Sequence, residues 1–190
     1  MEDYAWVVEY LPLGRAAALK KEPIVQLLGT SFFTLLEATV KPNVSIIISQ
    51  KVYVGKEGRQ EVDHIKGRIK YEDLTNGARD FLPNMLKRTV AEREKDFVTF
   101  INKAKPISIR VHTIDLLPGI GKKNMMALLS ERDKQPFESF EDIKKRVPSI
   151  TDPVTIFTNR ILSELEGNEK YYLFTKPPIE LIRSSQSFRR

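Results

Sequence analysis

Residues 116–123, which read LLPGIGKK, combine residue types that suit phosphate binding. Gly119 and Gly121 carry no Cβ, so an anion can approach the backbone N–H groups beside them closely. Lys122 and Lys123 follow at once and place two positive charges at the same point. The segment therefore predicts a contact with the phosphate backbone of a nucleic acid, with little reading of base sequence. The residues assigned to this contact are Pro118, Gly119, Ile120, Gly121, Lys122 and Lys123.

The apolar spacing around this segment predicts helices that position it. One short helix ends at Leu116 and Leu117, and a second begins at Lys122. A third is expected over residues 140–146, and a fourth should begin at Pro153 after Asp152 and stop at Gly167. Ser139 and Asp142, with N-cap spacing, mark the start of the third.

The segment resembles the helix-hairpin-helix motif of DNA-repair and recombination proteins, through Leu116, Leu117, the Pro-Gly-Ile-Gly turn and Ala127. The whole of residues 107–175 resembles a tandem pair of such units, as in bacterial competence DNA receptors. The second unit is degenerate, because VPSITD has Ser149 and Thr151 where the motif has glycines. Lys144, Lys145 and Arg146 precede it and could approach a nucleic-acid strand or form a solvated helix end.

Three alternatives to phosphate binding stay open. The turn could be a tight connector that only packs its helices. Lys123 could be the nucleophile of a DNA glycosylase-lyase, although the acids that follow, Glu138, Glu141 and Asp142, have the context of a helix cap. The chain could also be a protein-binding adaptor. The absence of the expected catalytic setting favours a protein that is not an enzyme.

Residues 1–74 contain five short β-branched or aromatic runs, YAWVVEYL, PIVQLLGT, FFTLLEATV, VSIIISQKVYVG and HIKGRIKY. Without helical periodicity between them, they predict a small antiparallel β-barrel, like an oligonucleotide-binding (OB) barrel, and hence an α+β fold. Aromatic and basic residues at alternating positions could bind nucleic acid on this barrel or form a solvated face. The candidates are Lys51, Tyr53, Lys56, Arg59, Lys66 and Arg68.

Residues 75–106 predict a connecting helix in which Pro83 kinks the first turns or marks the start, and residues 176–190 predict a flexible tail. Residues 75–106 and 167–190 hold the basic excess behind the net charge of +6, since residues 1–74 and 107–166 are neutral. A basic chain favours a polyanionic partner, RNA or DNA.

Several kinds of chemistry find no support in the sequence. The chain has no cysteine, which excludes disulfides and thiolate metal sites. His64 and His112 are too far apart in the sequence to suggest a metal site, and no nucleotide-binding loop or hydrolase motif is present. We therefore expect no metal and no cofactor. No run has the length of a signal peptide or membrane span, so the expected location is the cytoplasm, without a membrane partner.

Six segments together resemble an archaeal family of unknown function whose members are described as nucleotide- or RNA-binding proteins: YAWVVEYLPLG, VYVGKEGR, IKGRIKYEDLT, HTIDLLPGIGKK, PFESFEDIKKRV and KYYLFT. The resemblance extends to about Thr175. It implies an OB-type barrel joined to helix-hairpin-helix units, with no established catalytic activity. Genes of the family often lie beside those for RNA polymerase and ribosomal-RNA modification. The resemblance thus implies partners in transcription or ribosome maturation and favours RNA over DNA.

Overall fold

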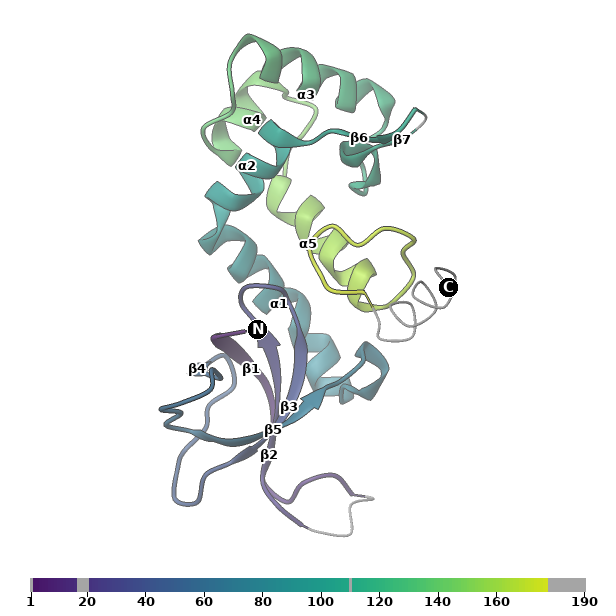
Figure 1. Ribbon diagram of the computed structural model, residues 1–190. Coiled ribbons are helices and arrows are strands. Elements are labelled where there is room, and N and C mark those ends of the chain that lie inside the picture. The colour runs from purple at the N-terminus through teal and green to yellow at the C-terminus, as the bar shows by residue number, and fades with distance from the viewer. Residues whose placement is uncertain (1, 17–20, 110, 178–190) are drawn as a thin grey trace. The chain divides into compact units, whose positions relative to one another are not determined.

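The computed structural model describes residues 2–16, 21–109 and 111–177. In this part of the chain, a curled antiparallel half-barrel of five strands is accompanied by five α-helices (Figure 1), which makes the fold α+β. The chain forms two compact units, Met1–Met85 with Ser163–Arg190, and Leu86–Leu162. These limits fall inside helices α1, Asn76–Glu92, and α5, Pro153–Leu165, and differ from the limits expected at residues 74 and 106. Most of the expected tail, residues 178–190, lies outside the described residues.

The half-barrel of the first unit has the strand order β4-β1-β2-β3-β5. Its strands are β1 (Tyr4–Leu11), β2 (Ile24–Gly29), β3 (Leu35–Val40), β4 (Lys51–Tyr53) and β5 (Val62–Arg68). Strands β1 to β4 each lie within one of the five expected runs, whereas β5 begins two residues before the fifth run, which starts at His64. The fourth run gives only three strand residues, because Ser49 has a φ of 70° and turns the chain just before them. Ile47, upstream of this turn, is 69% exposed.

Alternating side chains from all five strands fill the inside of the curl. They are Ala5, Val7, Val25, Leu27, Ala38, Val40, Val52, Val54 and Val62. The opposite side of the sheet is also buried at β2, where Gln26 is inaccessible to solvent. The Gln26 amide donates to the carbonyl of Asp73 (3.0 Å) and accepts from the Thr75 N–H (3.0 Å). These bonds join the sheet to the 3-10 turn η1 (Tyr71–Asp73) and the start of α1.

Two helices occupy the stretch expected to form one connecting helix. α1 is followed by α2 (Glu94–Lys103), and Arg93 between them leaves helical geometry at φ −108° and ψ 27°. Pro83 lies inside α1, which already begins at Asn76, so the proline does not mark the start of the helix.

The second unit continues from α2 with the hairpin β6 (Pro106–Ser108) and β7 (Val111–His112), then the 3-10 turn η2 (Thr113–Leu116). Helices α3 (Lys122–Lys134), α4 (Phe140–Arg146) and most of α5 follow. The ring of Phe157 on α5 holds this unit together, with ring centroids 4.7 Å from Phe97, 5.9 Å from Phe140 and 6.0 Å from Phe100. These α4 and α5 bounds confirm the positions expected for the third and fourth helices.

Candidate nucleic-acid interface

The turn before α3 is defined by one hydrogen bond and one unusual backbone angle. The N–H of Ile120 donates to the carbonyl of Leu117 (3.1 Å), which closes a four-residue turn. Gly119 has a φ of 80°, as the third position of a type II turn requires, and Pro118 suits the second position. Ile120 is buried and anchors the turn, whereas Pro118, Gly119 and Gly121 are exposed. The element before the turn is the single 3-10 turn η2, not a full helix.

Gly121 is the N-cap of α3, and it leaves the first N–H groups of the helix open. A glycine N-cap has no side chain to accept a bond from these groups, which also have no acceptor within the helix. A Cβ built on Gly121 would meet no atom within 4 Å, so the approach from solvent is free. Its φ of −79° and ψ of 173° suit any residue. Nothing in the fold itself therefore requires glycine at this position.

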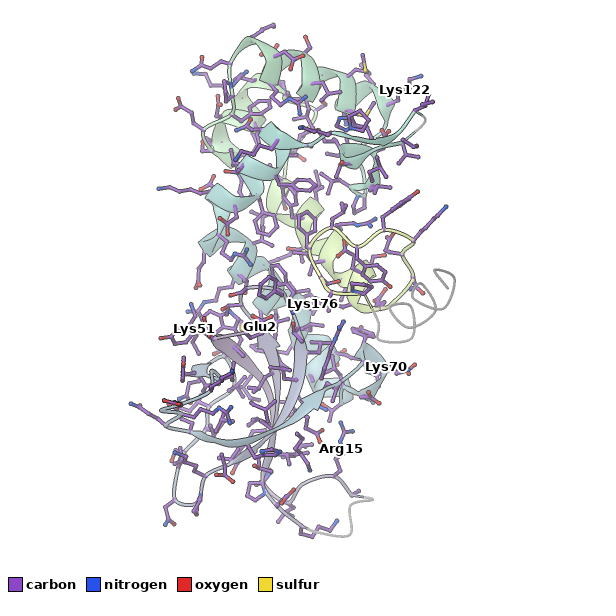
Figure 2. The ribbon with its side chains drawn as sticks, in the orientation of Figure 1. Glu2, Arg15, Lys51, Lys70, Lys122 and Lys176 are labelled. Atoms are coloured by element: carbon purple, nitrogen blue, oxygen red, sulfur yellow. The ribbon has the colours of Figure 1, made fainter. Side chains whose placement is uncertain are left out.

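Lys122 and Lys123 form the first turn of α3 and are exposed. Lys122 is labelled in Figure 2. Neither ammonium group pairs with a carboxylate among the residues that the structure describes. Two positive charges at the N-terminus of a helix oppose its macrodipole, and the first turn of α3 contains no acid. The charge at this end is thus slightly unfavourable for the helix alone and suits a bound anion.

A second turn, residues 147–151, repeats the hydrogen bond and the burial pattern of the first. The N–H of Ile150 donates to the carbonyl of Val147 (2.9 Å), and Ile150 is buried while Pro148 and Ser149 are exposed. Ser149 does not have the positive φ of Gly119, so the peptide plane before it faces differently. The helix that follows, α5, is capped by its own carboxylate, because Asp152 accepts from the N–H of Thr155 (3.0 Å).

The two turns meet at one point. The hydroxyl of Ser149 donates to the side-chain carbonyl oxygen of Asn124 (2.8 Å), in the first turn of α3. Of the three cations before the second turn, Arg146 is engaged in packing: its guanidinium lies 4.4 Å from the Phe137 ring centroid and donates to the Gln135 carbonyl (2.8 Å). Lys144 pairs with Glu141, which leaves Lys145 as the exposed cation of the three.

The structure does not bring the six barrel candidates onto one face. Lys51 and Tyr53 lie together on β4, on the side opposite the core valines. Lys56 is exposed in the loop after β4, while Arg59 donates to the carbonyl of Gly55 (2.6 Å) and stabilises that loop.

The remaining two candidates, on β5, are separated by an irregular register. Lys66 pairs with Glu22 (3.1 Å), and Arg68 donates to the carbonyl groups of Lys176 and Pro177. Sequence reasoning missed the residues that do join Lys51 and Tyr53, namely Tyr4 and Trp6, which face them across the β1–β4 pairing. Only the register of that pairing reveals them.

Of the acids and histidines singled out in the sequence, Glu141, Asp142 and His112 have side chains that are engaged in local structure. Asp142 accepts from the Glu138 N–H (3.2 Å) and pairs with Arg146, and His112 accepts from the Ile114 N–H (3.1 Å). Partial burial and the nearby Arg132 lower the pKa of His112. Within residues 2–16, 21–109 and 111–177, no group of three or more His, Asp or Glu side chains could hold a metal ion. The helices of that same part include none long and apolar enough to span a membrane.

Comparison with known proteins bears on all of these elements. Residues 1–176 match the family described as "Protein of unknown function (DUF655)". The chain belongs to the DUF655 family. An uncharacterized protein of Methanocaldococcus jannaschii, MJ0038, is 44% identical over 177 residues, which are 92% of this chain and 80% of that protein. The crystal structure of the DUF655 protein Af1531 from Archaeoglobus fulgidus is similar, with a TM-score of 0.85 and 40% identity. That match covers 92% of this chain and 100% of the other.

Proposed function

We propose that this DUF655 protein is a non-catalytic nucleic-acid-binding protein that holds the phosphate backbone at the start of α3. One observation carries the proposal. The N–H groups in the first turn of α3, after Gly121, are open, and the two lysines of that turn are exposed and pair with no carboxylate among the described residues. Both features weaken α3 as an isolated helix, and both favour a bound phosphate. The turn and its repeat support a likeness to helix-hairpin-helix units, with η2 in place of the first helix.

The chemistry of this site is recognition of the phosphodiester backbone, which RNA and DNA share. A phosphate oxygen can accept from N–H groups at the helix start while an ammonium group neutralises its charge. Such contacts fix the position of a strand without reading bases. The proposed ligand is therefore a nucleic acid of any base sequence. The affinity for it should fall as the salt concentration rises.

The first unit supports the same proposal through its connectivity. β1 pairs with β2 and with β4, while β3 pairs with β5. The pairing of β1 with both β2 and β4 supports the proposal of an OB-like barrel, left open between β4 and β5. OB barrels bind oligonucleotides and oligosaccharides, so the connectivity suits a nucleic-acid ligand but does not identify one.

The test is a salt series with a labelled RNA and a labelled DNA, each single-stranded and duplex. We expect log affinity to fall against log salt concentration with a slope of about −2 to −4, from two to four phosphate contacts. Lys122→Ala with Lys123→Ala should weaken binding to all sequences and reduce the slope by about one to two.

The matched control is Lys95→Ala with Lys103→Ala, which removes the same charge from α2. If the Lys122 and Lys123 variant melts normally and keeps the affinity and slope of the wild type, the turn is a connector and the proposal is wrong. Equal losses in both double variants would show a general effect of charge and would also contradict the assignment to this turn.

A further inference from the structure

Exposed aromatic rings and lysines lie, within the first unit, at the end of the half-barrel where β1 begins and the β2–β3 turn stands. Tyr4 is 48% exposed and Phe32 is 41% exposed, and each has a lysine ammonium group over its ring. We call Tyr4, Phe32 and Tyr53, with Lys51 and Lys176, the aromatic rim. In the view of Figure 2, Glu2 lies between Lys51 and Lys176.

Strand register assembles one end of the rim. The β1–β4 pairing places Tyr4 opposite Tyr53 and Trp6 opposite Lys51. The two tyrosine rings are 5.4 Å apart at an angle of 67°, and the Lys51 Nζ lies 5.9 Å from the Tyr4 centroid and 5.1 Å from that of Trp6. Trp6 itself is buried, so Tyr4 is the ring that a ligand can reach.

A buried carboxylate holds the other end in place. Glu2, only 3% exposed, accepts from the N–H groups of Ser31 (2.8 Å), Phe32 (3.0 Å) and Thr34 (3.1 Å). A Cβ on Gly29 would lie 2.1 Å from the Glu2 carboxyl carbon, so only glycine leaves room for it.

The same turn also bonds to β1, because the Thr30 N–H donates to the Tyr4 carbonyl (2.9 Å). The backbone of the turn that carries Phe32 is therefore fixed beside that of Tyr4 before any ligand arrives. Lys176 completes this end, with its Nζ 4.8 Å from the Phe32 centroid.

We propose that the aromatic rim stacks unpaired bases of a single-stranded nucleic acid, while Lys51 and Lys176 turn from the rings to its phosphates. A ring covered by an ammonium group can exchange that partner, since an exposed cation–π pair contributes only about two- to fivefold to an equilibrium constant. Stacking a base on an aromatic side chain contributes about 5- to 150-fold. Two cations beside the rings complement the negative charge of the strand.

This inference rests on the proposed function in taking nucleic acid as the ligand, but it uses a separate site. The Glu2 carboxylate adds no exposed negative charge to the rim, because it is buried and bonded to backbone N–H groups. The α3 turn contacts backbone alone, whereas the aromatic rim requires bases that are not paired. The aromatic rim therefore specifies a single-stranded ligand, whereas the α3 turn does not distinguish single strands from duplexes.

The experiment uses the single tryptophan of the chain as a built-in probe. Trp6 lies under Lys51, so a strand that draws Lys51 away from the indole should change its fluorescence. The probes are oligo(U) and oligo(dT), each against a duplex of equal length. We expect single strands to change Trp6 emission and duplexes to leave it unchanged. Tyr4→Leu with Phe32→Leu should weaken single-strand binding at least tenfold.

Controls separate ring chemistry from folding. Tyr4→Phe keeps the ring and should bind like the wild type. Tyr171→Leu removes the ring of another cation–π pair, with Lys170 at 5.5 Å, which is not part of the aromatic rim, and should also leave binding intact. Melting curves of all variants establish that each is folded at the temperature of the assay.

The outcomes distinguish this inference from the proposed function. Suppose that the Tyr4 and Phe32 variant loses single-strand binding while the Lys122 and Lys123 variant keeps it. This result would support the aromatic rim and refute phosphate binding at the α3 turn. The reverse result would refute the rim and support the turn. Binding that prefers duplexes, or Trp6 emission that no oligonucleotide changes, would overturn the rim.

Discussion

Gly121→Asp separates stability from binding, because the change should raise one and lower the other. The φ and ψ of Gly121 suit aspartate, and its Cβ would point into open space. Aspartate is a better N-cap than glycine by a few tenths of a kcal/mol, and its charge favours the helix start by about 0.3–1 kcal/mol. The variant should therefore be more stable than the wild type by roughly 0.5–1 kcal/mol.

Binding should change in the opposite direction. The new carboxylate would occupy the place proposed for the phosphate and would attract Lys122 and Lys123 to itself. Two like charges about 4 Å apart repel by about 1 kcal/mol in water and about 4 kcal/mol near a protein surface. Affinity should thus fall at least about fivefold, and the salt slope should shrink by about one contact.

The measurements are thermal melts and fluorescence anisotropy with a labelled oligonucleotide at two salt concentrations. Ser130→Asp is the control, because it adds the same charge to the exposed side of α3, about 13 Å along the helix at 1.5 Å per residue. A Gly121→Asp variant that binds like the wild type would refute phosphate binding at the helix start. A variant that is clearly less stable would refute the reasoning about the open N-cap.

Three further predictions concern the stability of the fold. Gly119→Ala should destabilise the protein by roughly 1–2 kcal/mol in a denaturant titration, because its φ of 80° is costly for a residue with a Cβ; no loss would mean that the turn adapts. Glu164→Ala should cost roughly 3 kcal/mol or more in the same assay, because buried Glu164 accepts from the N–H groups of Leu173, Phe174 and Thr175; a loss below 1 kcal/mol would contradict this role. Hydrogen bonds from Thr155, with smaller contributions from Lys87 and Lys144, lower the pKa of Asp152 below 3.8, so its carboxylate stabilises α5 above that pH and loses this effect as pH falls through the lowered pKa. The stability gap between the wild type and Asp152→Asn should accordingly close in melts at about pH 2 compared with pH 7, and a gap independent of pH would contradict the assignment.

Helix limits were predictable where the signal is local. The Asp142 N–H donates to the Ser139 side chain (3.0 Å), and α4 covers residues 140–146 as the cap predicts. α5 begins at Pro153 after Asp152, and Gly167 with a φ of 81° follows its end. Caps and stops act within a few residues of the chain, so a pattern in the sequence contains the needed information.

Features that depend on distant partners were not predictable in this way. The break between α1 and α2, and the shortness of β4, have no clear local signal. Arg146 was grouped with two lysines as a possible strand contact, yet it packs on Phe137 and bonds to the carbonyls of the loop after α3. The partners of Lys51 and Tyr53 come from β1, and their identity follows only from the register of a pairing between residues far apart in sequence.

The paired turns also explain why only one of them suits an anion. Both turns close with a hydrogen bond from an isoleucine N–H, and both isoleucines, Ile120 and Ile150, are buried. The two turns therefore pack in the same way. The position after the turn differs in charge: Lys122 stands at the start of α3, whereas the equivalent Asp152 caps α5 with its own carboxylate. A phosphate at the second turn would meet that carboxylate, while one at the first turn would meet two lysines. The bond between Ser149 and Asn124 then gives the second turn a supporting role, since it fixes the first turn of α3 where the proposed phosphate binds.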